Sequence, residues 1–213
     1  MTFRKLSRRA VLAFALAAPL LSPGAARADA TDDALAKVTK ARKELKTLIA
    51  RFTQVRQVGL LAEEVKSTGE LTVVTPDKLR WELFPPDSIV FWVVKGGVFY
   101  RDAKGKVGKA PPGAMGALVG DLITFLGGDI GALKARYDLT ANEESDGSVK
   151  IVAVPKSDEA KKALKRLEVR TNAERWGVSR IVIEEPSGDS SVITFETNKK
   201  NEKVDPDKMK PPA

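Results

Sequence analysis

Residues 69–84, GELTVVTPDKLRWELF, constrain the fold of this 213-residue chain more than any other segment. They contain two runs in which apolar and polar residues alternate, separated by Thr75-Pro76-Asp77. Such alternation is typical of strands with one buried face, and a Pro-Asp cluster is typical of a turn. The apolar residues share one face only if Val73 pairs with Leu79, which leaves an odd connection over residues 74–78. That register gathers on a single apolar face Leu71, Val73, Leu79, Trp81 and Leu83.

Similar short runs, separated by turn-forming residues, occupy most of the chain. They cover residues 68–74, 78–84, 88–95 and 98–102, and then 137–141, 148–155, 164–171, 178–185 and 191–197. The short spacing favours two antiparallel meanders. Residues 88–95, SIVFWVVK, are apolar on both faces, so we expect this strand to be covered on both sides.

Two segments have helical spacing instead. Residues 31–58 carry apolar side chains three and four positions apart, with Arg42 and several lysines on the other side, and predict one long amphipathic helix. Residues 114–136 have similar spacing but contain many glycines, each of which weakens a helix by roughly 1 kcal/mol relative to alanine. They predict one or two short helices, either a plain cover for the core or a mobile lid. The elements together predict one α+β domain.

The first 28 residues have the features of a secretory signal peptide. A basic start, MTFRKLSRRA, is followed by an apolar run over residues 10–21 and by an A-x-A site that ends at Ala28. We expect cleavage before Asp29 and a single mature domain over residues 29–213. A membrane anchor is the weaker alternative, because the apolar run is too short to span a bilayer and contains Pro19. Residues 7–12, SRRAVL, are close to a twin-arginine pattern, so the export route (Sec or Tat) stays open.

Composition narrows the functional classes. The chain has 36 basic and 28 acidic residues, and removal of the five basic residues of the leader leaves 31 basic ones. Because no basic run is interleaved with aromatic residues, we do not expect nucleic-acid binding. The chain has no cysteine, so its cleavage site has no residue that could carry a lipid anchor. We expect a soluble periplasmic monomer.

The inventory of reactive side chains argues against an enzyme. The absence of histidine removes His-based triads and most zinc sites. No G-x-S-x-G motif is present, and residues 105–113 lack the spacing of a phosphate-binding loop. Asp205-Pro206-Asp207 lacks the further oxygen ligands of a calcium loop and is better explained as a turn. The carboxylate pairs are adjacent in sequence, and nothing places two of them across a cleft. We expect no catalytic residue, metal site or cofactor.

Three quoted stretches carry a resemblance to a known family. They are FTQ (Phe52-Thr53-Gln54), GELTVVTPDKLRWELFPPDS (residues 69–88) and VVKGGVFYRD (residues 93–102). Together with the leader they resemble the outer-membrane lipoprotein carrier protein family (LolA-like), in which F-x-Q closes the first helix before a Trp-bearing hairpin. The resemblance is good over residues 35–102 and rests on the order of elements elsewhere. From pattern alone, a closed and well-packed core is the default interpretation of the apolar face and a ligand cavity is the alternative, whereas the resemblance favours the cavity.

The resemblance implies an incomplete, curved antiparallel β-barrel, with an N-terminal helix and short central helices that cover its concave face. It implies a periplasmic carrier that shields lipoprotein acyl chains, or related lipids, between an inner-membrane ABC-type release complex and an outer-membrane acceptor. A free acyl chain in water costs on the order of 10 kcal/mol, which such a cavity removes. The expected cavity wall comprises Leu45, Leu48, Phe52, Leu71, Val73, Leu79, Trp81, Leu83, Phe91, Val93, Leu118, Leu122, Phe125 and Leu126.

One position departs from the family pattern. The family has an Arg directly before the loop proline, where it helps to keep the lid closed, whereas this chain has Thr75. Since a short hydroxyl cannot reach several carbonyls as a guanidinium does, either another group latches the lid or the cavity stays more open.

Because Thr75 departs from the family pattern, alternative functions remain open. One is a carrier for a non-lipoprotein lipid. Another is a lipid- or lipoprotein-sensing regulatory protein of the same fold that binds an anti-sigma partner. We rank this second alternative lower because it predicts a further C-terminal domain, which we do not expect here. A lipid hydrolase is opposed by the lack of a nucleophile and base.

Overall fold

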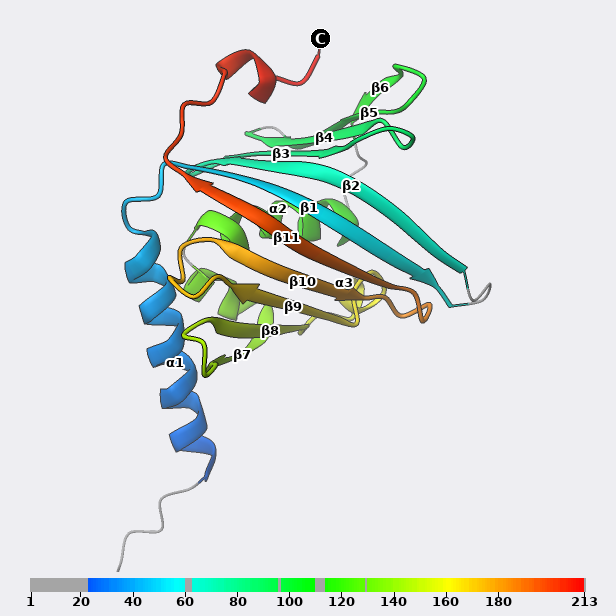
Figure 1. Cartoon of the computed structure of the whole chain (residues 1–213). Coiled ribbons are helices and arrows are strands. Elements are labelled where there is room, and N and C mark those ends of the chain that lie inside the picture. Colours follow the sequence, from blue (N-terminus) through cyan, green and yellow to red (C-terminus); the bar gives the residue numbers. More distant parts are fainter. Residues whose placement is uncertain (1–22, 60–62, 96, 110–113, 129, 213) are drawn as a thin grey trace, which may run out of the picture.

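The computed structural model describes residues 23–59, 63–95, 97–109, 114–128 and 130–212. Most of the predicted signal peptide lies outside these ranges. Within them, eleven strands form one antiparallel sheet in the order β6-β5-β4-β3-β2-β1-β11-β10-β9-β8-β7. The sheet curves strongly and does not close, because β6 and β7 remain as its two edges (Figure 1). The predicted half-barrel with helices on one side is confirmed.

The strands divide into two meanders that meet at β1 and β11. The first meander comprises β1 (Thr47–Val58), β2 (Glu63–Val74), β3 (Lys78–Leu83), β4 (Ile89–Val94), β5 (Gly97–Arg101) and β6 (Val107–Lys109). The second comprises β7 (Tyr137–Glu143), β8 (Val149–Pro155), β9 (Arg166–Thr171), β10 (Val178–Glu184) and β11 (Ser190–Lys200). Each strand pairs with its neighbour in sequence, and the pairing of β1 with β11 joins the halves. Short turns between strands dictate this order, since they bring consecutive strands together.

The prediction of one long helix over residues 31–58 is wrong. Helix α1 (Pro23–Arg42) ends at Arg42, although the predicted helix continues to residue 58. After a short turn the chain forms strand β1 from Thr47. Leu48, Ala50 and Phe52 are buried in strict alternation, as a strand requires. The spacing from Leu48 to Phe52 fits one face of a helix and one face of a strand equally well. The β-branched residues of TLIARFTQV favour the strand.

The hairpin over residues 69–84 has the predicted register. Val73 pairs with Leu79 and Leu71 pairs with Trp81. Val74 and Lys78 also pair, so the ladder reaches the last residues on either side of the Pro76 turn. The apolar set therefore lies on one face, which is the concave face of the sheet.

Two short helical elements follow the first meander, as predicted. They are α2 (Ala114–Gly127) and the 3₁₀ helix η1 (Ile130–Ala135). In Figure 1, α2 lies behind the sheet, on its concave side, and α1 runs along one end of the second meander. Phe125 and Leu126 of α2 are fully buried in the same core as Leu71 and Leu79. The core therefore lies between the concave face and these helices.

Three short elements were not predicted, namely α3 (Asp158–Lys161), β6 and the 3₁₀ helix η2 (Pro206–Met209). The last of these covers the convex side of β4. The indole nitrogen of Trp92 donates a hydrogen bond of 2.9 Å to the carbonyl of Lys208, while Val93 is buried in the concave core. The prediction that this strand is covered on both faces is confirmed.

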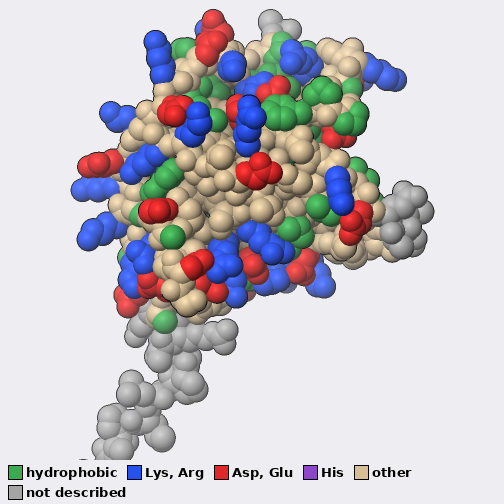
Figure 2. Space-filling model, in the orientation of Figure 1, with side chains coloured by type: hydrophobic (Ala, Val, Ile, Leu, Met, Phe, Trp, Pro, Cys, Tyr) green, Lys and Arg blue, Asp and Glu red, His purple; other side chains and the backbone are tan. Residues whose placement is uncertain are grey.

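The surface away from α2 is mixed in charge. Figure 2 shows Lys and Arg side chains interleaved with Asp and Glu across this face. No helix among the described residues combines the length and the apolar character needed to cross a bilayer.

Candidate binding cavity

An apolar cavity of about 290 Å³ lies between the concave face of the sheet and α2. Its lining comes from both meanders and from the helix, and comprises Gln54, Leu79, Trp81, Phe91, Leu122, Ile181, Ile183, Ser191 and Ile193. Gln54 and Ser191 supply the polar side chains of this lining. The remaining seven side chains are aliphatic or aromatic, so the cavity offers apolar contact to a ligand and few hydrogen bonds.

Strand register places these side chains on one face. Trp81 on β3 pairs with Phe91 on β4, and Leu79 pairs with Val93. Across the junction of the two halves, Gln54 on β1 pairs with Ile193 on β11, which pairs in turn with Ile181 on β10. Because directly opposed residues of antiparallel strands project from the same face, these pairs form a continuous wall.

The wall becomes more exposed toward one end of the strands. On β2, Leu71 is fully buried, whereas Val65, six residues earlier on the same face, is 46% exposed. On β1, burial falls from Phe52 through Gln54 to the exposed Arg56. The same trend holds from the buried Leu79 to the partly buried Trp81, and from the buried Ile181 to the partly buried Ile183. The cavity therefore has a closed end near Leu79 and a mouth toward the β1–β2 and β10–β11 turns.

Three aromatic rings form the floor of the closed end. The ring centroids of Phe52 and Trp81 are 4.5 Å apart, and Phe195 lies 5.7 Å from Phe52. The Phe52 ring can pack directly against strand β2 because its cross-strand partner is Gly69, which has no side chain. A Cβ added to Gly69 would lie 2.4 Å from the Phe52 ring and 2.1 Å from the carbonyl oxygen of Glu82. Glycine at this position is therefore required for the close contact between β2 and the aromatic floor.

Arg42, at the end of α1, fastens α2 over the closed end. Its Nη1 donates a 2.7 Å hydrogen bond to the carbonyl of Phe125, and its Nε donates to the carbonyl of Trp176 at 3.3 Å. Phe125 lies in the last turn of α2, where carbonyls lack helical partners and the helix dipole is negative. Burial lowers the pKa of Arg42 to about 10, so the group remains cationic at neutral pH. Among the described residues no carboxylate pairs with it, and its Nη2 has no hydrogen-bond partner.

A second polar contact anchors the middle of α2. Asp121 is buried and accepts a 2.6 Å hydrogen bond from the Tyr137 hydroxyl, and it also forms an ion pair with Arg136. Desolvation raises the pKa of Asp121, although its two partners oppose the shift. Burial and the neighbouring carboxylate raise the pKa of Tyr137 as well. This contact ties α2 to the start of β7.

Thr75 lies beside the end of α2 but does not bond to it. Its hydroxyl donates to the carbonyl of Leu45 at 2.7 Å. A Cβ added to Gly127, the last residue of α2, would lie 3.2 Å from the Thr75 methyl group. Position 75 thus faces the helix end that Arg42 already holds through Phe125.

The expected cavity residues fall into three groups. Leu79, Trp81, Phe91 and Leu122 line the cavity. The side chains buried in the surrounding core are Leu45, Leu48, Phe52, Leu71, Val73, Val93, Phe125 and Leu126, and Leu83 is partly buried against them. Leu118 falls on α2, outside the residues whose side chains the structure describes. The assignment of this wall to lipid remains a prediction.

Sequence reasoning missed the half of the wall that the second meander supplies. Ile181, Ile183 and Ile193 alternate within SRIVIEEPSGDSSVITF, so the signal of a strand face was present. The pattern could not predict that β11 pairs with β1, and this pairing places the apolar face of the second meander opposite Trp81. Arg42 was placed on the polar side of a helix and is instead buried, because α1 ends there and turns it toward α2.

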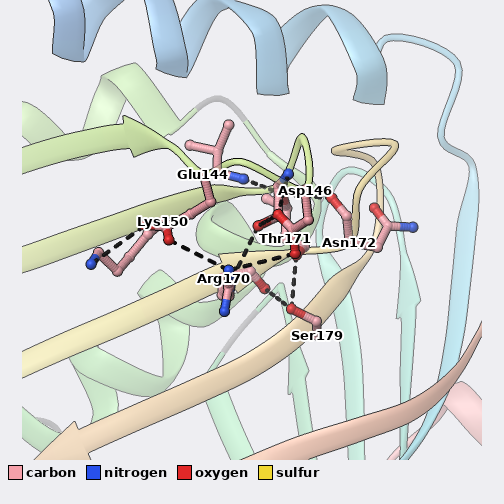
Figure 3. Close-up of polar contacts among 9 residues, drawn as sticks. Glu144, Asp146, Lys150, Arg170, Thr171, Asn172 and Ser179 are labelled. Atoms are coloured by element: carbon pink, nitrogen blue, oxygen red, sulfur yellow. Dashed lines mark hydrogen bonds and ion pairs between the residues drawn. The ribbon is translucent and has the colours of Figure 1, made fainter.

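Two acidic residues of the second meander, Glu144 and Asp146, form ion pairs that connect the β7–β8 turn to β9. Figure 3 shows the side chain of Arg170 near Glu144 and Asp146. Its Nη2 lies 3.5 Å from a carboxylate oxygen of each, and its Nε donates a 3.0 Å hydrogen bond to the Ser148 hydroxyl. The Ser148 hydroxyl also lowers the pKa of Asp146. These contacts tie the β7–β8 turn to β9. Within the described part of the chain, no cluster of three acidic or other metal-ligating side chains is placed to hold a metal ion.

Solved structures share this fold at low sequence identity. A DUF1329 family protein from Desulfovibrio piger aligns with a TM-score of 0.52 and 10% identity, over 85% of this chain and 97% of that chain. MucB aligns with a TM-score of 0.51 and 16% identity, over 87% of this chain and 64% of its own. In the Pseudomonas aeruginosa MucA/MucB complex the TM-score is 0.50 at 16% identity, over 85% and 60% of the two chains. This chain therefore spans less than two thirds of MucB.

Sequence comparison gives a more specific result. No curated protein sequence matches the chain. Residues 43–211, which begin in the turn after α1 and extend past η2, match the family described as outer membrane lipoprotein carrier protein LolA. That match covers the whole sheet and the helices over it. The chain belongs to the LolA family of outer membrane lipoprotein carrier proteins.

Proposed function

We propose that this protein is a periplasmic carrier that shields the acyl chains of lipoproteins, or of related lipids, in the cavity beneath α2 and moves them from the inner to the outer membrane. The observation that carries the proposal is the cavity of about 290 Å³, in which seven of nine lining side chains are apolar. Family membership points the same way. The predicted leader supplies the export that the role requires.

The apolar wall suits a cargo that must be held and then released. Each buried methylene contributes about 0.8 kcal/mol, so the affinity of an acyl chain grows with its length and needs no specific hydrogen bond. Aliphatic walls such as Ile181, Ile183 and Ile193 impose little directional preference on a flexible chain. A carrier built this way lets binding strength follow the area of lipid that is covered.

Entry of a large cargo requires movement of the cover, which we propose is α2 and η1. Arg42 then acts as the latch that the family places at position 75. Its bond to the Phe125 carbonyl closes the helix end over the cavity. A buried cation without a carboxylate partner is costly, so this closed arrangement is only modestly favoured over an open one in which Arg42 is hydrated. That balance suits a lid that must open for each cargo.

The proposal is tested by incubating the purified mature protein with membranes that carry a radiolabelled triacylated lipoprotein. We expect a soluble one-to-one complex. Trp81→Asp places a charge in the cavity wall and should abolish the complex. Val154→Asp introduces the same charge at a site that is 39% exposed on β8, away from the cavity lining, and should leave the complex unchanged. Absence of any soluble complex, or an active Trp81→Asp protein that is folded, would contradict the proposal.

A further inference from the structure

The mouth of the cavity carries a group of polar side chains with no partner. They are Gln54 on β1, Ser67 on β2 and Ser191 on β11. Ser67 is 9% and Ser191 7% exposed, and Gln54 is partly buried. None of the three side chains makes a hydrogen bond with the described residues. Their polar atoms are not among the fully buried side-chain atoms that lack a partner in the described part of the chain, so they remain open to water or to a ligand in the cavity.

Register places the three side chains together. Gln54 pairs directly with Ser67 on one side, and with Ile193 on the other. Ser191 lies two residues from Ile193 on the same face of β11. Gln54 and Ser191 both line the cavity. The group therefore forms a polar step on the concave face, one register position beyond the floor at Phe52.

The next residue toward solvent on this face, Arg56, is charged and already forms ion pairs with two carboxylates. Arg56 follows Gln54 on the same face of β1 and pairs with Ser191 across the ladder. Its guanidinium lies 3.5 Å from Glu185 and 3.3 Å from Asp189. Two carboxylates thus surround one cation. An anionic ligand head at this place would meet net negative charge, whereas a neutral head would meet free hydroxyl and amide groups.

From this arrangement we infer that the cavity mouth is a subsite for the carbonyl of a neutral acyl ester or acyl amide, with the attached alkyl chain running toward Leu79. The inference rests on the proposed function and names its ligand class. Gln54 can donate to the carbonyl through its amide NH₂, and Ser67 and Ser191 can each donate through a hydroxyl. An ionised fatty acid is disfavoured, because its carboxylate would lose hydration without gaining a free cation.

The size of the cavity limits the ligand further. Pockets for small ligands have volumes of roughly 300 to 1,000 Å³, so a cavity of about 290 Å³ is slightly smaller than this range. With α2 in place, the cavity accommodates one alkyl chain. A cargo with several chains would occupy this subsite with one chain and require displacement of α2 for the others.

A competition experiment tests the subsite. A fluorescent naphthylamine dye is bound to the purified mature protein and displaced by three ligands with the same alkyl chain: dodecanoylglycerol, N-dodecanoyl ethanolamide and dodecanoate. We expect the ester and the amide to displace the dye at concentrations at least roughly fivefold lower than dodecanoate requires. One or more hydrogen bonds to the carbonyl supply a factor of this size. Displacement by only one of the two neutral ligands would identify the source of the carbonyl and still support the subsite.

Two variants locate the effect. Gln54→Leu and Ser191→Ala should each reduce the ratio between neutral ligands and dodecanoate several-fold, while dodecanoate itself changes little. Thr53→Val is the matched control, because Thr53 lies on the opposite face of β1 and bonds to the exposed Glu196. Equal displacement by all three ligands, or a preference that persists in both variants, overturns the subsite and leaves the carrier role standing. Failure of every ligand to displace the dye overturns both.

Discussion

The Nη1 atom of Arg42 lies 2.7 Å from the carbonyl oxygen of Phe125, so a buried cation at the end of α1 caps the C-terminus of the helix that covers the cavity. The two residues are 83 positions apart in the chain. Their contact links the segment before the sheet to the segment between the two meanders. We propose that this contact takes the role that the resemblance assigns to an Arg at position 75.

Loss of this contact should loosen α2 more than it destabilises the protein. In Arg42→Met the helix end loses a charge-assisted bond worth about 1.5–3 kcal/mol, while the cost of burying a cation also disappears. We expect backbone amides of α2 to exchange with deuterium several-fold faster, with a net change in unfolding free energy smaller than the bond itself. Lys43→Met, at the exposed neighbouring position, is the control. Unchanged exchange in α2 would contradict the latch.

An Arg at position 75 should substitute for Arg42. Thr75 already faces Gly127, so a guanidinium there can reach the last carbonyls of α2. We expect Thr75→Arg to restore slow amide exchange in the Arg42→Met background. In the parent protein it should slow lipid uptake, measured by stopped-flow fluorescence of a labelled acyl chain. Uptake at the parental rate and no rescue of exchange would show that position 75 does not reach α2.

Gly69→Ala should destabilise the sheet at the aromatic floor. Because the new methyl group would lie 2.1 Å from the Glu82 carbonyl oxygen, the strands must move apart, at a cost of roughly 1–3 kcal/mol. Gly120→Ala provides a contrast, since its Cβ meets no atom within 4 Å and alanine favours helix by about 1 kcal/mol. Urea unfolding measures both. Equal effects of the two substitutions would argue against close packing of Phe52 on Gly69.

The raised pKa of Asp121 predicts a pH dependence with an unusual sign for a carboxylate. The folded state holds this proton more tightly than the unfolded state, so stability from this group is present below the ordinary pKa and is lost as pH rises through the raised folded value. Asp121→Asn removes that dependence. We therefore expect the variant to gain in unfolding free energy relative to the parent as pH rises from strongly acidic to neutral. A gain in the opposite direction would mean that Arg136 and Tyr137 outweigh desolvation.

The sequence was most informative where local pattern and turn chemistry act together. Alternation around Pro76 gave the pairing of Leu71 with Trp81, because a shift by one residue would have divided the apolar set between two faces. It was least informative at residues 43–58, where one apolar spacing suits a helix and a strand. The pairing of β1 with both β2 and β11 decides that conflict, and the pairing with β11 joins residues more than 130 positions apart.

The same limit applies to the cavity. Pattern and resemblance together predicted the cavity residues Leu79, Trp81 and Phe91 of the first meander. Ile181 and Ile193 belong to the wall because β11 pairs with β1, and no local sequence signal predicts that pairing. Arg42 was missed for a related reason, since its burial depends on where α1 ends and on a helix far away in sequence.

Quenching of Trp81 fluorescence by a brominated acyl chain tests whether an acyl chain lies against Trp81 beneath α2. Trp92→Phe and Trp176→Phe together leave Trp81 as the sole tryptophan, because the chain has three. We predict saturable quenching of Trp81 at one chain per protein. Trp81→Phe, which retains Trp92 on the convex side and Trp176, should show little quenching. Unquenched Trp81 in a protein that binds the brominated chain would contradict the account.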